Sequence, residues 1–271
     1  MNIHLQDLQS LHGSVRWYSQ ASRPLHAYHP IIARLLSTDD PAGTWVSPRG
    51  NPSIKRWAWL EFWEVLQLHR LMQHHEECYK TPYINTFVGG LPFGYRLAIP
   101  SERRKMVLLG GDATPGMLYG ANYNAKVAAV LPWTAARQLA VEVSLKGTGV
   151  AERDIPDMII AIQELLWALV AFAASCDSGV KHSVHMAIID NQNAVQWIKK
   201  RQAHNMYAAH YLRILSRLEQ WSTNELTAAW VSTTRNEEAD HGSRDVHLDH
   251  QDNVVGKEIL LRRLNEYSKI L

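Results

Sequence analysis

The stretch Ile-Ile-Asp-Asn-Gln-Asn-Ala-Val at residues 188–195 is an apolar, strand-like run that delivers one carboxylate and then turns into a helix. A strand end holds its backbone rigidly and lets an Asp side chain emerge, which suits a metal ligand. The same pattern is also typical of a turn or a helix N-cap. The role of Asp190 therefore depends on which other carboxylates join it.

The composition describes a chain that can bury a core. With 271 residues and 46% hydrophobic side chains, it has room for one large domain or two modest ones. Cys78 and Cys176 lie far apart and in no zinc-binding pattern, so we expect an intracellular, reducing compartment: cytoplasm or nucleus, with an organelle left open. No apolar run reaches the length of a membrane span, and we expect no membrane partner. The net charge of +2 means that nucleic-acid binding would need local basic patches.

The first part of the chain, residues 1–100, predicts a mainly helical region. Two helical segments are expected between residues 5 and 36. A longer helix is expected over Ile54–Glu77, with Leu60 and Trp63 among the residues spaced for a buried stripe.

A new unit opens with an apolar strand over Met106–Thr114 that carries Asp112. A strong helix, about Met158–Cys176, follows later and carries Glu164 among apolar neighbours. An isolated buried charge is very costly, so Glu164 needs a partner, either a metal or a salt bridge or cap. Between the strand and the helix, three strand-like segments predict an antiparallel meander: Met117–Tyr123, Lys126–Trp133 and Gln138–Leu145.

Beyond Asp190 the pattern alternates helix and strand again. Asp240 lies in the last segment of this part, just after the final strand. The expected elements are helices over Gln192–Arg201 and Met206–Trp221, a strand over Leu226–Ser232, and a helix or turn over Asn236–Arg244. The expected division of the chain is a helical region at 1–100, an α/β domain at 101–250 and a C-terminal helix at 251–271.

Four carboxylates are the candidate catalytic and metal-binding residues: Asp112, Glu164, Asp190 and Asp240. In a mixed sheet whose first and fourth strands are neighbours, Asp112 and Asp190 lie side by side with Glu164 above them. Like charges so close need counter-ions, and carboxylate ligands favour hard cations, so we expect two Mg²⁺ ions, with Mn²⁺ as a possible substitute. Such a pair of ions can activate a water and stabilise the leaving oxygen in phosphodiester hydrolysis. The pattern predicts a nuclease site.

The motifs around these carboxylates resemble a known family. They are Asp112-Ala113-Thr114, Glu164-Leu165, the stretch Asp190 to Val195, Trp230-Val231-Ser232, and Asn236 with Ala239, Asp240, Ser243 and Arg244. In this order they are similar to the ribonuclease H domain of retroelement reverse transcriptases, in the style of DIRS-like and Ty3-like retrotransposons. The likeness covers about residues 105–246. Residues 8–36 are more loosely similar to the connection-like segment after the polymerase palm and thumb of such enzymes.

The resemblance implies a ribonuclease H-like mixed five-stranded sheet flanked by helices, preceded by the helical region. It implies a hydrolase that binds an RNA/DNA hybrid, or structured RNA, and cuts the RNA strand. A polymerase domain or larger assembly would contact residues 1–100. Contacts to 2′-hydroxyls are expected from Gly110, Gly111, Asn191 and Gln192. Contacts to phosphates are expected from five basic residues, unless these form a solvated helix face: Lys199, Lys200, Arg201, Arg213 and Arg217.

The chain also departs from the family. Cellular ribonucleases H carry a mobile His in the loop that Thr233-Thr234-Arg235 occupies here, and an insertion is expected around Leu145 to Asp154. The alternative function is a domesticated, non-catalytic ribonuclease H-like subunit with a structural or RNA-binding role. An exonuclease on the same fold would need Asp-x-Glu on the first strand, and integrases end in a helix Glu, so both fit less well.

Overall fold

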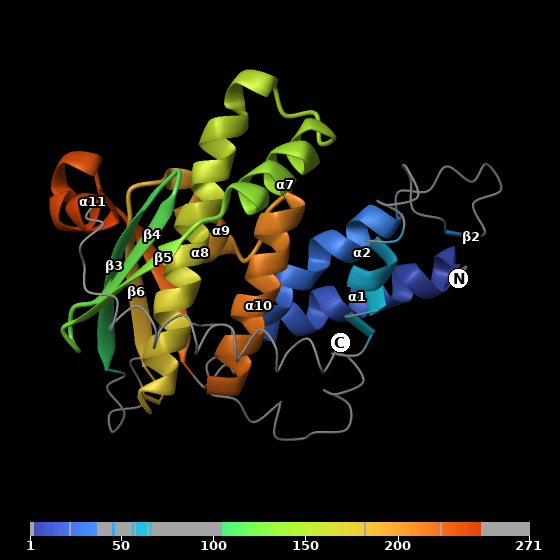
Figure 1. Cartoon of the computed structure of the whole chain (residues 1–271). Helices are drawn as coiled ribbons and strands as arrows, with labels where there is room; N and C mark the ends of the chain where they lie inside the picture. Colours follow the sequence, from blue (N-terminus) through green and yellow to red (C-terminus); the bar gives the residue numbers. More distant parts are fainter. Residues whose placement is uncertain are drawn as a thin grey trace. The chain divides into compact units, whose positions relative to one another are not determined.

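The computed structural model describes residues 3–21, 23–36, 45–46, 56, 58–63, 65–66, 105–181, 183–222 and 224–244. The chain divides into two compact units, Met1–Arg103 and Arg104–Leu271 (Figure 1). The C-terminal helix predicted at 251–271 lies outside the described residues.

The described part of the first unit is mainly helical. Its core is apolar and includes Leu8, Ile31 and Ile32, each at most 1% exposed. Buried residues recur at helical spacing within each helix, as Leu8 and Val15 do in α1 and Ile31 and Leu35 do in α2, so each helix presents one apolar face to the core. The elements are α1 (Leu5–Ala21), the 3-10 helix η1 (Arg23–Tyr28), α2 (His29–Leu36), and the short antiparallel strands β1 (Ile3–His4) and β2 (Trp45–Val46). The two helical segments predicted between residues 5 and 36 are confirmed.

The described residues of the third predicted helix are also helical, but its buried face differs from the prediction. Leu60 is 57% exposed and Trp63 is 46% exposed, whereas Phe62 and Val65 are buried. The ring of Phe62 packs edge-on against Trp59. The predicted stripe is therefore wrong at Leu60 and Trp63, because spacing alone does not show which of two apolar faces meets the core.

The second unit is an α/β domain built on a five-stranded mixed sheet flanked by helices. The strands lie in the order β5-β4-β3-β6-β7. The first three strands in sequence form an antiparallel meander, while β6 runs parallel to β3 and β7 runs parallel to β6. Their bounds are β3 (Met106–Thr114), β4 (Met117–Asn122), β5 (Val127–Pro132), β6 (Val184–Ile189) and β7 (Glu225–Trp230).

Helices cover both faces of this sheet (Figure 1). Gly120 of β4 faces Trp167 of α8, while its neighbours Tyr119 and Ala121 pack against Ala239 of α11. Successive strand residues point to opposite faces, so α8 and α11 lie on opposite sides. The helices are α7 (Ala135–Lys146), α8 (Ile155–Asp177), α9 (Gln192–Lys200), α10 (Met206–Ser222) and α11 (Glu237–Arg244), with 3-10 turns η2 (Glu152–Asp154) and η3 (Thr233–Arg235).

The strand predicted over Gln138–Leu145 is wrong, because this segment lies within α7. Thr134 caps the helix by accepting a hydrogen bond from the backbone N–H of Arg137. Only Val141 and Leu145, four residues apart, are buried on it. The apolar residues at every second position imitate a strand, yet two of them remain exposed in the helix.

Helix α8 carries apolar residues on nearly all sides, and most of these side chains are buried in the domain. Within the described part of the chain, the segment Glu152–Asp177 has the length and composition to cross a membrane, and an 18-residue window within it has a mean hydropathy of 1.9. However, 83% of that window is buried inside the structure. It therefore behaves as the core helix of a soluble domain.

Candidate metal centre

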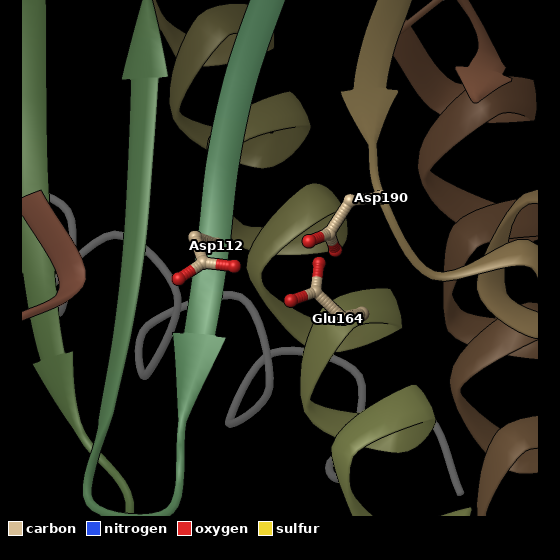
Figure 2. A group of neighbouring side chains, drawn as sticks. All are labelled: Asp112, Glu164 and Asp190. Atoms are coloured by element: carbon tan, nitrogen blue, oxygen red, sulfur yellow. The ribbon is translucent and has the colours of Figure 1, made fainter. Parts of the chain in front are cut away.

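Three carboxylates from three different elements converge near the C-terminal ends of the neighbouring inner strands β3 and β6. Asp112 lies on β3, Glu164 on α8, and Asp190 directly after β6, and one ligand oxygen from each lies within 4.8 Å of the others. Figure 2 shows the three carboxyl groups pointing toward one another. The parallel register pairs Gly110 with Ile188, which brings Asp112 and Asp190 to the same level. The predicted adjacency of the first and fourth strands is confirmed.

Glu164 is the most deeply buried member of the group, with 1% of its surface exposed. Its Oε1 accepts a hydrogen bond from the backbone N–H of Ala113 at 2.8 Å, and its Oε2 accepts one from the indole N–H of Trp167 at 2.5 Å. Burial raises the pKa of Glu164 well above its usual value, and the negative charges of Asp112 and Asp190 raise it further. A bound cation would favour the ionised form of this carboxyl group.

The indole ring of Trp167 packs against the sheet at Gly111, where the missing side chain leaves room for it. A Cβ added at Gly111 would clash with the Trp167 ring. Gly111 is buried, and its carbonyl accepts a hydrogen bond from Asn236 Nδ2 at 3.2 Å. The predicted nucleic-acid contact from Gly111 is therefore wrong: the residue admits the ring and bonds to the segment before α11.

Asp112 is also buried, with 6% of its surface exposed. The hydroxyl of Ser243 on α11 donates to its Oδ2 at 2.6 Å. Burial raises the pKa of Asp112, the Ser243 hydrogen bond opposes this, and the negative charges of Asp190 and Asp240 raise it again. The carboxylates thus repel one another, as expected for a site that holds a cation.

Asp240, the fourth predicted ligand, lies on α11 outside the group of three. Its Oδ1 accepts a hydrogen bond from Arg244 at 2.6 Å, in an ion pair along the helix. Its charge still acts on Asp112, so it belongs to the surroundings of the site. Helix α11 approaches the sheet closely because Gly242 leaves room for the ring of Tyr119.

Asp190 is partly exposed and is held by the end of β7 and by the turn η3 that follows it. The hydroxyl of Thr233 donates to its Oδ2 at 3.0 Å, and the indole N–H of Trp230 donates to its backbone oxygen at 2.9 Å. The roles of Trp167, Thr233 and Trp230 were not predicted. Only the spacing of Trp167, three residues after Glu164 on a helix, could have indicated its contact.

The start of α9 lies next to Asp190. Asn191 is the N-cap, and its side-chain oxygen accepts hydrogen bonds from the backbone N–H groups of Asn193 and Ala194. This oxygen is therefore occupied within the helix, whereas Gln192 is exposed. Both residues follow Asp190 directly in the chain, and their predicted contacts with nucleic acid remain predictions.

The five predicted phosphate contacts fall into two groups. Lys199 and Lys200 are exposed at the end of α9, and Arg217 is partly exposed on α10. Arg201 and Arg213 are buried, at 0% and 1% exposure, so the prediction is wrong for these two. A buried guanidinium cannot reach a phosphate outside the domain without leaving its site.

Arg201 belongs to a buried ion pair. Its guanidinium donates to both carboxylate oxygens of Glu219 on α10 and to the backbone oxygens of Ile198 and Leu226. The backbone of Arg201 adopts the left-handed conformation, with φ of 54°, as it ends α9. The arginine therefore joins α9, α10 and β7 in the interior.

No family model, curated protein or solved structure matches the chain. Asp112, Glu164 and Asp190 offer only oxygen ligands, and together they could bind a hard divalent cation.

Proposed function

We propose that this protein is a Mg²⁺-dependent endoribonuclease that cuts the RNA strand of RNA/DNA hybrids. The observation that carries the proposal is the convergence of Asp112, Glu164 and Asp190, three carboxylates supplied by separate elements. Holding like charges together in a largely buried place opposes folding unless cations offset the repulsion. Such a cluster of carboxylates is typical of a cation-binding site.

The residues fit a magnesium centre. Asp112, Glu164 and Asp190 would hold the metal, with Asp240 close enough to contribute charge. Their oxygen-only donor set favours Mg²⁺, or Mn²⁺ as a substitute, over zinc. When bound, two such ions supply activation of a water and stabilisation of the leaving oxygen in phosphodiester hydrolysis.

The chain's own residues hold the carboxylates in place. Ala113 and Trp167 each bond one oxygen of Glu164, so its carboxyl group cannot turn freely. Ser243 does the same for Asp112, and Thr233 does so for Asp190. Ligands fixed in this way lose little freedom on binding a cation, which favours affinity and a defined geometry.

The substrate is inferred from the sequence motifs together with the architecture. A mixed sheet of three antiparallel strands followed by two parallel ones is compatible with a ribonuclease H-like fold. The motifs resemble those of retroelement reverse transcriptases, so we infer a retroelement origin, an intracellular site of action and a polymerase domain or larger assembly as partner of residues 1–100. The remaining candidates for hybrid contacts are Asn191, Gln192, Lys199, Lys200 and Arg217.

The second candidate function is a non-catalytic, ribonuclease H-like subunit that binds RNA or supports a larger assembly. One observation favours it: Asp240 pairs with Arg244 outside the group of three carboxylates. A centre without its fourth ligand could bind a cation and still cut nothing.

A cleavage assay separates the two functions. A labelled RNA strand annealed to DNA is incubated with Mg²⁺ and the wild-type chain, Asp190→Asn or Asp157→Asn. Asp157 is an exposed residue in the first turn of α8 and controls for the change of charge. We expect Asp190→Asn to lower the rate on the order of 100-fold, as loss of one electrostatic group does, and Asp157→Asn to leave it unchanged. A wild-type chain that does not cut, or cutting unaffected by Asp190→Asn, rules out the nuclease.

A further inference from the structure

The side chain of Trp230 stands exposed at the edge of the candidate metal centre. It is the last residue of β7 and pairs with Ile189, the residue before Asp190. It is 51% exposed, although tryptophan is among the side chains that gain most from burial. Tryptophan has an apolar ring and one polar N–H, so a ring exposed beside three carboxylates is well placed to contact a ligand of that site.

The ring is held in place by its polar end. Its indole N–H donates to the backbone oxygen of Asp190 at 2.9 Å. This bond satisfies the only donor of the side chain and fixes the ring against the metal-ligand segment. The remaining indole surface is apolar and partly open to solvent.

The segments around this contact are exposed and able to form hydrogen bonds. Gln192 and Asn193 follow Asp190 on one side, and Thr234 and Arg235 follow Trp230 on the other. They offer amide, hydroxyl and guanidinium donors within a few residues of the ring. Such a surface suits a ligand with both flat rings and phosphate or hydroxyl groups.

We propose that Trp230 is a stacking subsite that holds a nucleobase or ribose of the bound nucleic acid beside the carboxylates. The proposal rests on the proposed function for the identity of the ligand. The Mg²⁺ ions that the carboxylates would hold attract a phosphate, and an uncharged ring beside them would add a contact to the adjoining base or sugar without adding charge. Stacking accepts any base, because every base has a π face, so the subsite binds without sequence preference.

Equilibrium binding tests the subsite apart from cleavage. A fluorescein-labelled RNA/DNA hybrid is titrated in Mg²⁺ with full-length Asp190→Asn, alone and combined with Trp230→Ala, Trp230→Phe or Leu139→Ala. Leu139 is 60% exposed on α7 and controls for loss of an exposed apolar side chain. We expect Trp230→Ala to raise Kd about tenfold, the scale of one stacked base, and Trp230→Phe and Leu139→Ala to stay within about threefold.

The phenylalanine variant separates stacking from positioning of Asp190. Both Trp230 variants lose the hydrogen bond to Asp190, but only the alanine variant loses the ring. Equal Kd values for the two variants would assign the effect to the lost hydrogen bond and overturn the subsite. An unchanged Kd for Trp230→Ala would overturn it as well.

Cleavage by the chain with Asp190 intact distinguishes failure of this proposal from failure of the nuclease. If hybrids are cut, Trp230→Ala is expected to raise KM about tenfold and to leave kcat within about threefold. Cutting with an unaltered KM overturns the subsite alone. Hybrid binding that depends on the Trp230 ring, without any cutting, supports the subsite and overturns the nuclease alone.

Discussion

At the scale of single residues, the position of the Glu164 carboxyl group depends on a hydrogen bond from the indole of Trp167. The pattern of charged residues in the sequence gives no indication of this contact. Trp167 donates to Glu164, and it can do so because Gly111 leaves the space that its ring fills. The glycine and the tryptophan therefore act together, and a larger residue at position 111 would displace the ring and with it the carboxylate. The candidate metal centre thus includes residues that hold the carboxylates as well as the carboxylates themselves.

Trp167→Phe tests this positioning role. The variant keeps an aromatic ring and removes the N–H donor, so we expect Mg²⁺ affinity to fall about tenfold, at the lower end of the range for lost outer-shell partners. The measurement is the rise of Tm with Mg²⁺ concentration. Trp133→Phe is the matched control, because the buried indole of Trp133 donates to Gln163. Equal Mg²⁺ affinity in the two variants would contradict the role of Trp167.

At the scale of elements, burial decides whether a basic side chain faces solvent or forms an ion pair in the interior. Lys199 and Lys200 remain exposed, whereas Arg201, the next residue, turns inward to Glu219. A run of three basic residues predicts a solvated or nucleic-acid-binding helix end, and of the three only Lys199 and Lys200, which lie within α9, are exposed to solvent. The sequence contains no sign of where Glu219 will lie, because the pair forms between α9 and α10.

Glu219→Gln measures the strength of this buried pair. The variant leaves the Arg201 charge in the interior without its carboxylate partner, and we expect the free energy of unfolding to fall by about 3 kcal/mol. Glu142→Gln, which breaks an exposed pair with Lys146, is expected to cost at most about 0.5 kcal/mol. Urea denaturation of both variants provides the comparison. Equal losses would mean that Arg201 and Glu219 contribute no more than a surface pair.

Much of the architecture could be predicted from hydrophobic periodicity. The strands β3, β4, β5, β6 and β7 and the helices α8, α9 and α10 lie within a few residues of their predicted positions. Helix α7 was missed because its exposed Leu139 and Val143 complete an alternating pattern. Three of the four candidate carboxylates could be placed from strand order, whereas their hydrogen-bond donors depend on side-chain packing that periodicity does not report.

At the scale of the whole molecule, we expect the three carboxylates to couple the binding of a cation to folding. Without divalent cations, Asp190→Asn removes a charge that raises the pKa of both Asp112 and Glu164, so we expect its Tm to exceed that of the wild type. With Mg²⁺ in excess, we expect the wild-type Tm to rise and the variant Tm to change little. Thermal melting in EDTA and in Mg²⁺ measures both. The same Mg²⁺ response in the two proteins would contradict a cation site at Asp190.

A second whole-molecule property is the stability of the domain in acid. His185 on β6 is fully buried between the hydroxyls of Ser175 and Ser183, and burial lowers its pKa to about 4. The unfolded chain takes up a proton near pH 6.5 while the folded chain does not, so stability is lost as the pH falls from about 6.5 to about 4. The loss from this group amounts to about 3 kcal/mol at pH 4.

His185→Gln isolates this contribution from that of the carboxylates, whose raised pKa values act in the opposite direction. We expect the variant to lose less stability than the wild type between pH 6.5 and pH 4. Each neighbouring hydroxyl keeps a second partner, since Ser175 bonds Asn122 and Ser183 bonds Asn224. Urea denaturation across this pH range measures the difference, and parallel curves would contradict a neutral, buried His185.

The parallel pairing of β3 with β6 also constrains the synthesis of the chain. The meander β3–β4–β5 emerges from the ribosome first, yet one side of β3 stays without its strand until β6 has been made. During that interval its backbone N–H and C=O groups, together with the apolar helix α8, are available to other chains. Asp112 likewise has no Asp190 beside it until β6 has been made and has paired with β3. A cation that requires both carboxylates can therefore bind only a chain in which this pairing is complete.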